Sequence, residues 1–319
     1  MITFFTGQPQ GYIAFIGIMA AFILTCFMTS KFADYLPKDL GRDFAFDGKK
    51  SAGKPRGAGL IFVLVFCILA LIFGEIDLEN SLYLLLVLAS MLTGFLDDAS
   101  KAPWGEYKKG FLDLLLAAGV AAVYLCFNPS TIHFAFLDIT VSISPIVFAL
   151  LAIILVWGSI NVTNCSDGVD GLSGTLTIIS IMTFYIIDVV RGRETNFTYF
   201  ILLFAVCILG YLWFNATPSK LLMGDAGSRA MGLFIAVAAL KSGSPLLFIP
   251  VAFVLIMDGG LGLLKVFLLR FLKIRILKNV RTPLHDQARK VSGWSNTQTV
   301  FRFAIIQLVI SMAVIYMVL

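Results

Sequence analysis

Long, nearly uncharged apolar blocks recur along the whole chain, and they constrain its fold more than any other feature. The block at 143–160, for example, contains no charged residue. A helix of about 20 apolar residues spans the hydrocarbon core of a bilayer, which is roughly 30 Å thick. Only 13% of the residues are charged, against about a quarter in soluble domains. The sequence therefore predicts an all-α integral membrane protein.

The apolar blocks predict about ten transmembrane helices in one polytopic domain that covers residues 1–319. The predicted helices are 11–30, 57–74, 80–97, 110–127, 143–160, 173–190, 197–214, 226–241, 245–268 and 300–319. The first block lacks the basic start and the small-residue cleavage site of a secretory signal, so we expect it to be retained as a span.

Basic residues are distributed unevenly among the predicted loops, and this sets the expected orientation. Three loops on one side share most of the positive charge: Lys31, Lys38, Arg42, Lys49, Lys50, Lys54, Arg56; Lys101, Lys108, Lys109; and Arg270, Lys273, Arg275, Lys278, Arg281, Arg289, Lys290. The opposite loops contain only Arg191, Arg193 and Lys241. By the positive-inside rule, the basic loops are cytoplasmic and both chain ends lie outside.

The segment 262–280 alternates apolar and basic residues at near-helical spacing. This pattern predicts an interfacial amphipathic helix that continues the ninth span along the inner membrane surface. A helix end whose basic side chains reach up to the headgroups would give the same pattern.

Cysteine and histidine are too sparse or too scattered for several kinds of site. The five cysteines show no C-x-x-C spacing, and the chain has two histidines, His133 and His285. Neither a disulfide framework nor a zinc site is therefore predicted. The net charge of +5 is explained by the cytoplasmic loops, so no nucleic-acid partner is expected.

Acidic residues gather at the predicted cytoplasmic ends of separate helices. They are Asp97 and Asp98 after the third helix, Asp167 and Asp170 in D-G-V-D-G after the fifth, and Asp225 in M-G-D-A-G-S before the eighth. Carboxylates on one side of the membrane can converge on one site. Mg²⁺ prefers such oxygen ligands together with substrate phosphates, and glycine-rich turns let the backbone approach a phosphate. The pattern predicts a magnesium and phosphate site.

Each acidic motif also has an ordinary structural explanation. Asp97 and Asp98 could be a solvated helix end, Asp225 a helix cap, and D-G-V-D-G a simple turn. Asp258 lies inside the ninth apolar block, where a charge is costly and indicates function; it could also hold Lys265 or a neighbouring helix end. Membrane acids and glycine-interrupted helices occur in secondary transporters as well.

Taken together, the motifs resemble the polyprenyl-phosphate N-acetylhexosamine-1-phosphate transferases, and among them the phospho-N-acetylmuramoyl-pentapeptide transferases. The similar motifs follow one another along most of the chain: K-P-R-G-A-G, D-D, N-V-T-N-C-S-D-G-V-D-G-L, N-A-T-P-S-K-L-L-M-G-D-A-G-S, R-T-P-L-H-D-Q and G-W. The resemblance implies Mg²⁺-dependent transfer of phospho-MurNAc-pentapeptide from its UDP-sugar to undecaprenyl phosphate, with release of UMP. It also implies a multi-pass protein of the bacterial inner membrane with a cytoplasmic site, and a homodimer.

The resemblance further assigns roles to residues that match the family's motifs. Asp225 is similar to the magnesium ligand, and Asp97, with Asp98 beside it, to the acid that deprotonates or positions the lipid phosphate. The residues implied in substrate binding are Lys101, Lys109, Asn164, Asp167, Asp170, Asn215, Lys265 and His285.

The sequence departs from the pentapeptide-transferase pattern at three places. His285, Asp286 and Gln287 stand where the family has three consecutive histidines, Leu222 stands where an aromatic residue is expected against uracil, and Lys265 replaces a glutamine. These positions concern donor recognition. A related transferase of GlcNAc-1-phosphate, or of another amino-sugar phosphate, is therefore the nearest alternative, and a secondary transporter is the alternative from a different class.

Overall fold

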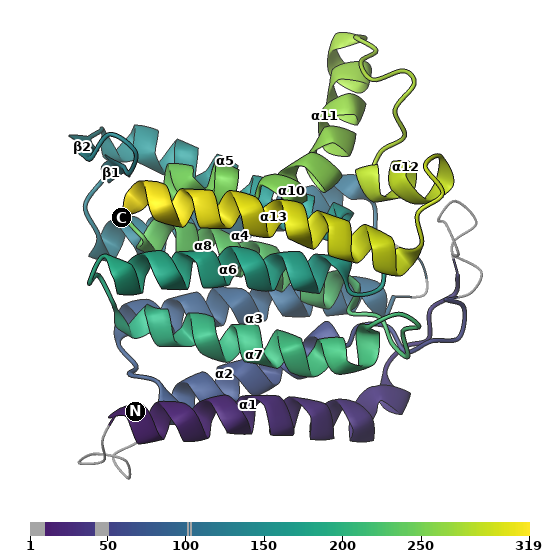
Figure 1. The fold of residues 1–319 in the computed structure, drawn as a ribbon, viewed down its shortest axis with the longest axis horizontal. Coiled ribbons are helices and arrows are strands. Elements are labelled where there is room, and N and C mark those ends of the chain that lie inside the picture. Colours follow the sequence, from purple (N-terminus) through teal and green to yellow (C-terminus); the bar gives the residue numbers. More distant parts are fainter. Residues whose placement is uncertain (1–9, 42–50, 101, 103) are drawn as a thin grey trace.

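Helices make up almost the whole molecule. The computed structural model describes residues 10–41, 51–100, 102 and 104–319. The long helices are α1 (Gln10–Phe32), α2 (Gly59–Phe73), α3 (Leu78–Asp98), α4 (Glu106–Phe127), α5 (Pro145–Cys165), α6 (Leu172–Val190), α7 (Asn196–Asn215), α8 (Gly224–Lys241) and α13 (Asn296–Val318). They lie side by side, and α1 begins at the same end of the bundle where α13 ends (Figure 1).

Each of the ten predicted segments is helical, which confirms the all-α membrane class. In the part of the chain that the structure describes, seven helices are long and apolar enough to cross a membrane, or up to eight if the bent pair after α8 counts as one span. α2 is apolar but has 15 residues, and α8 includes Asp225, Arg229 and Lys241. The number of ten crossings stays a prediction.

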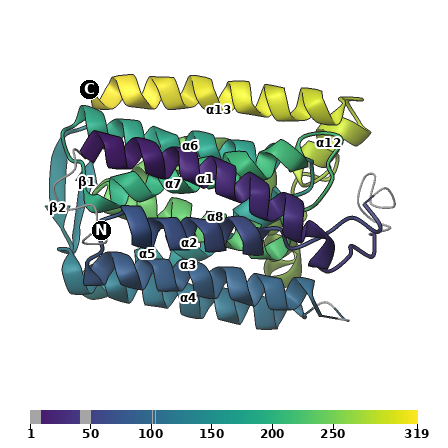
Figure 2. The same ribbon diagram turned by 90° about the horizontal axis from the view of Figure 1, so that it is seen from below.

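The helix α8 occupies the middle of the bundle, in contact with α2, α3, α5 and α6 (Figures 1 and 2). Of its 18 residues, 17 are buried. Many of them are glycine or alanine, because small residues let helices approach closely where lipid supplies no hydrophobic driving force between them.

Glycines make the closest approaches to α8. A Cβ added to Gly59 of α2 would meet the backbone of Gly227 in α8, and a Cβ added to Gly94 of α3 would meet the backbone of Asp225 and Ala226. These contacts place the end of α3 and the start of α2 directly against the first turn of α8.

The predicted ninth helix, 245–268, is not continuous. It is divided into η3 (Pro245–Leu247), α9 (Phe248–Val251), α10 (Phe253–Leu255), the π-helical turn η4 (Ile256–Gly260), α11 (Leu261–Phe267) and the π-helical turn η5 (Leu268–Leu272). The two halves meet at Ala252 with a bend of 69°. Pro250 lacks an N–H, and a proline inside a helix interrupts its hydrogen-bond ladder.

The prediction of a helix over 262–280 is correct only as far as Leu272. There the chain turns through Lys273, whose φ is +58°, and continues without regular structure to α12 (Leu284–Lys290). The segment α11–η5 leaves the bundle sideways (Figure 1). Its exposed Leu264, Phe267 and Phe271 suit a lipid environment.

Two short strands were not predicted. β1 (Thr131–Phe134) pairs with β2 (Ile139–Ser142) in an antiparallel hairpin, with Thr131 opposite Ser142. The small η2 helix (Ala33–Tyr35) follows α1 at the end of the bundle where α12 lies. The hairpin lies at the end of the bundle away from α12 (Figure 1).

We expect Gly59→Ala to destabilise the protein, because the added methyl group meets the backbone of Gly227 rather than a side chain that can move aside. Overpacking of this kind costs about 1–3 kcal/mol. Gly110→Ala in α4 is the matched control, since nothing lies within 4 Å of its added Cβ and alanine favours a helix by about 1 kcal/mol over glycine. Melting temperatures of the purified variants in detergent measure the difference; equal values would contradict the close α2–α8 approach.

Candidate active site

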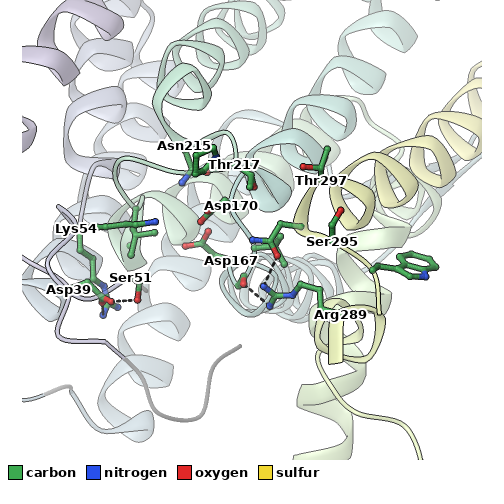
Figure 3. A pocket seen from close by; sticks show the side chains of 18 of the residues that line it. Asp39, Ser51, Lys54, Asp167, Asp170, Asn215, Thr217, Arg289, Ser295 and Thr297 are labelled. Atoms are coloured by element: carbon green, nitrogen blue, oxygen red, sulfur yellow. Dashed lines mark hydrogen bonds and ion pairs between the residues drawn. The ribbon is translucent and has the colours of Figure 1, made fainter. Parts of the chain in front are cut away.

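A cavity of about 730 Å³ lies among the connecting segments at the α12 end of the bundle. Its wall comes from the segment before α2, the α5–α6 turn, the α7–α8 connection and the α12–α13 connection. Labelled side chains from these segments, among them Asp39, Asp167, Asp170 and Arg289, surround it (Figure 3). Most of the side chains around it are polar or charged, which suits a hydrophilic ligand rather than a lipid tail.

Asp225, at the start of α8, is the acidic residue of this helix that lines the cavity. One carboxylate oxygen, Oδ2, is 2.9 Å from Nζ of Lys109, and the other, Oδ1, is 3.5 Å from Nη2 of Arg56. Lys109 also forms an ion pair with Asp97. One lysine thus joins the acid at the end of α3 to the acid at the start of α8.

Asp98 holds the α3 end to the backbone of α8. Its Oδ2 accepts a hydrogen bond of 3.1 Å from the N–H of Ala226, and its Oδ1 is 2.8 Å from Nε of Arg56. This Arg56 contact is an ion pair that lacks the alignment of a hydrogen bond. Among the described residues, Oδ1 of Asp98 therefore has no hydrogen-bond partner. Gly224 has φ +68°, and a Cβ there would meet the Asp98 carboxylate. Only glycine therefore fits this turn.

Arg56 is the cation that links the acids to the rest of the wall. Besides Asp98 and Asp225 it approaches Asp39, with Nη1 3.5 Å from Oδ1. Burial lowers the pKa of the guanidinium, but the negative charges of Asp98, Asp225 and Asp39 outweigh this effect and raise the pKa above its usual value. Arg56 consequently stays charged at every working pH.

The acids Asp167 and Asp170, predicted from D-G-V-D-G, both line the cavity. Asp170 accepts a hydrogen bond of 3.2 Å from the N–H of Ser219, which ties the α5–α6 turn to the α7–α8 connection. Lys54, from the segment before α2, donates to the Ser219 hydroxyl at 2.9 Å. The D-G-V-D-G turn is thereby fixed on the side that faces the cavity.

The two predicted asparagines form hydrogen bonds that connect segments of the cavity wall. The Asn215 side chain accepts from the N–H of Gly171 at 2.8 Å and donates to the carbonyl of Leu221 at 2.9 Å. Asn164 donates to the Ser228 hydroxyl at 3.0 Å. Both residues line the cavity, but their amide groups already bind the protein; contact with a nucleotide stays a prediction.

Five of the predicted site residues that the structure describes do not line this cavity: Asp97, Asp98 and Lys109, which belong to the ion pairs around Asp225, and Lys265 and His285. Lys101 lies outside the described residues. Lys265 donates to the carbonyls of Leu277 and Val280 at 3.1 and 3.0 Å, which holds the irregular segment after η5 against α11. His285 is buried, with Nδ1 2.8 Å from Oδ2 of Asp258, and its backbone N–H donates to the same carboxylate at 2.7 Å.

The pairing of Asp258 with His285 gives the buried acid of the ninth segment a local role. It anchors the start of α12 to the π-helical turn η4. The same turn of α12 meets the D-G-V-D-G loop, where a Cβ at Gly168 would meet the His285 ring. His285 therefore packs against Gly168, a residue of the cavity wall, without lining the cavity itself.

Several cavity residues were not predicted as site residues. Arg289 donates to the carbonyl of Gly168 at 3.0 Å and to Asp286 at 2.9 Å. Partial burial raises the pKa of Asp286, but the hydrogen bond from Lys290 and the nearby cations hold the pKa below its usual value. Lys54 and Arg56 belong to the recognised K-P-R-G-A-G motif and could have been found there, whereas no sequence pattern marks Asp39 or Arg289.

A magnesium ion would find suitable ligands here, provided that substrate supplies the remainder. Among the described residues, no three carboxylate, histidine or cysteine side chains are grouped so that they alone could hold a metal. Mg²⁺ commonly takes one or two carboxylates and completes its shell with phosphate and water. Asp225 at the wall, with Asp167 and Asp170 on the same cavity, fits that mode of binding.

Comparison with known proteins identifies the family of the chain. Residues 80–243 match the profile of glycosyl transferase family 4. A phospho-N-acetylmuramoyl-pentapeptide-transferase of Treponema pallidum is 41% identical, over 93% of this chain and 88% of the relative. Transferases of the same name from Acetivibrio thermocellus and Thermotoga neapolitana are 29% and 28% identical, over 80% and 91% of this chain and 78% and 92% of the relatives. The chain therefore belongs to the phospho-N-acetylmuramoyl-pentapeptide transferases of glycosyl transferase family 4, and it is a membrane-embedded transferase.

Proposed function

We propose that the protein transfers phospho-MurNAc-pentapeptide from its UDP-sugar to undecaprenyl phosphate at the cytoplasmic face of a bacterial inner membrane. An oxygen of the lipid phosphate attacks the β-phosphorus of the donor. The bond from that phosphorus to the bridging oxygen breaks, UMP leaves, and a lipid-linked diphosphate sugar forms. The names of the relatives favour this donor over UDP-GlcNAc.

The observation that carries the proposal is the placement of Asp225 at the wall of a polar cavity between Lys109 and Arg56. Phosphoryl transfer depends mainly on positioning and on neutralising phosphate charge. In the described cluster, the four carboxylates of Asp39, Asp97, Asp98 and Asp225 face two cations, Arg56 and Lys109. The cluster thus has more acidic than basic side chains, and this excess would attract a cation.

Asp225 would hold Mg²⁺ together with the donor diphosphate, and the ion would supply charge neutralisation between acids and phosphates. Lys109 and Arg56 hold the carboxylates together by offsetting their mutual repulsion, and they fix Asp225 at the cavity wall. The second pKa of a phosphate is near 6, so the lipid phosphate is largely ionised at neutral pH. Asp97 therefore acts chiefly in positioning, through Lys109.

The placement of the acids disfavours the transporter alternative. Transporter sites lie near the bilayer midplane, whereas Asp97, Asp98 and Asp225 lie at helix ends on the α12 side of the bundle. Asp258, the residue that most favoured the transporter hypothesis, binds His285 through its carboxylate. We infer the cytoplasmic location of the site and the external location of both chain ends from the basic loops; the homodimer implied by family resemblance stays a prediction.

We expect Asp225→Asn to lower kcat by about 10²–10³-fold, a loss typical for a group that stabilises transition-state charge. The measurement is UMP release by purified protein with undecaprenyl phosphate, UDP-MurNAc-pentapeptide and Mg²⁺. Asp138→Asn is the matched control, because Asp138 is an exposed acid of the hairpin at the far end. If the wild type releases UMP only from UDP-GlcNAc, the protein uses the alternative donor. If it releases UMP from none of the UDP-sugars, the transferase function is refuted.

We expect Arg56→Gln to lower kcat/KM by about 100-fold and Arg56→Lys to retain part of the activity. Lysine keeps the charge but lacks the planar fork that approaches Asp39, Asp98 and Asp225 together. Steady-state kinetics with the UDP-sugar varied would measure both variants, and Arg193→Gln, at an exposed site, is the control. Wild-type kinetics for Arg56→Gln would show that the guanidinium is not needed for donor use.

A further inference from the structure

A second ion pair lies one helical turn deeper in the bundle than the Lys109–Asp225 pair. Arg229 of α8 and Asp113 of α4 are both buried, and Nε of Arg229 donates to Oδ1 of Asp113 at 3.0 Å, with Nη2 bound to the same oxygen. Nη1 of Arg229 is buried without a hydrogen-bond partner among the described residues. Neither residue lines the cavity.

The spacing of the two pairs is the same on both helices. Asp113 follows Lys109 by four residues on α4, and Arg229 follows Asp225 by four residues on α8. Residues four apart in a helix lie on one face, one above the other. The two ion pairs are therefore successive links between the same faces of α4 and α8.

These links matter because α4 and α8 touch little otherwise. α4 packs mainly on α3 and α5, and these two helices make the main contacts to α8. The rotation and height of α4 relative to α8 are thus poorly determined by direct packing. An ion pair between buried side chains has a defined distance and direction, so it constrains both the rotation and the height of α4 relative to α8.

Stability alone does not account for a buried ion pair. The desolvation cost of the two charges commonly cancels their attraction, and apolar residues of similar volume are often as stabilising or more so. The best supported use of such pairs is to fix the register of helices. We propose that Arg229 and Asp113 are positioning residues that set α4 against α8 so that the amine of Lys109 stays at the Asp225 carboxylate. The catalytic part of this inference rests on the proposed function.

The test is the double variant Asp113→Leu/Arg229→Met, which replaces both charges with apolar side chains. We expect its melting temperature to equal or exceed that of the wild type, because no unpaired charge remains. We expect kcat for UMP release to fall at least tenfold, since a misplacement of about 1 Å costs up to about 100-fold. KM for the UDP-sugar should change less than about twofold, because neither residue lines the cavity.

A matched control exists at the other end of the same helix. Lys241 of α8 pairs with Glu79 of α3 at 2.8 Å, about 24 Å from Asp225 at 1.5 Å per residue. Glu79→Leu/Lys241→Met also removes an ion pair from α8, one that is partly buried. We expect it to leave kcat unchanged, whatever its melting temperature.

A second measurement does not depend on activity. Acetylation of Lys109 by acetic anhydride, followed by mass spectrometry, reports how firmly its amine is held by Asp97 and Asp225. We expect several-fold faster acetylation in Asp113→Leu/Arg229→Met and the wild-type rate in the control. If the wild type fails to release UMP, the proposed function fails, and the acetylation rates alone decide the positioning role.

Two results would overturn the inference. One is wild-type kcat and wild-type Lys109 acetylation in a folded Asp113→Leu/Arg229→Met protein. The other is a loss of kcat in both double variants in proportion to their melting temperatures, because the pair would then contribute only to stability.

Discussion

The neutralisation of carboxylates at the end of an apolar bundle is the constraint on which the rest of this structure depends. Asp225 begins a helix that is enclosed on all sides, and an unpaired charge in such a place is strongly destabilising. Lys109 arrives from α4 and Arg56 from the segment before α2. Both cations also bind acids at the end of α3. Three helices and a loop must therefore meet at one point, and that point adjoins the cavity, which Arg56 and Asp225 line.

Close helix packing makes this meeting geometrically feasible. Gly59 and Gly94 allow α2 and α3 to touch the first turn of α8, and Gly224 leaves room for the Asp98 carboxylate. Glycines thus serve both the approach of the helices and the space needed by the charge cluster. Helix packing also positions charged groups, since Gly94 lies against the backbone of Asp225 and Gly224 against the Asp98 carboxylate.

Much of the fold and part of the site followed from the sequence, for identifiable physical reasons. Apolar blocks mark helices because the bilayer demands them, and the grouping of Asp97, Asp98 and Asp225 followed from their common side. The break at Ala252 was missed although Pro250 signals it. The roles of Arg56, Asp39 and Arg289 depend on contacts between residues distant in the chain, and local patterns do not encode such contacts. For the same reason, the sequence could not show that His285 is buried against Asp258.

The enclosure of α8 has a consequence for how the chain is assembled during synthesis. A charged residue at the centre of a helix raises the cost of inserting that helix into lipid by roughly 2.5–3.5 kcal/mol, and α8 has Asp225 and Arg229 in its first two turns. The helices that surround α8, namely α2, α3, α5 and α6, and the partners Arg56, Lys109 and Asp113, all precede it in the chain. When α8 leaves the ribosome, the residues that carry its counter-charges have already been synthesised. The order of the helices along the chain thus lets the most polar of them enter a prepared protein environment instead of lipid.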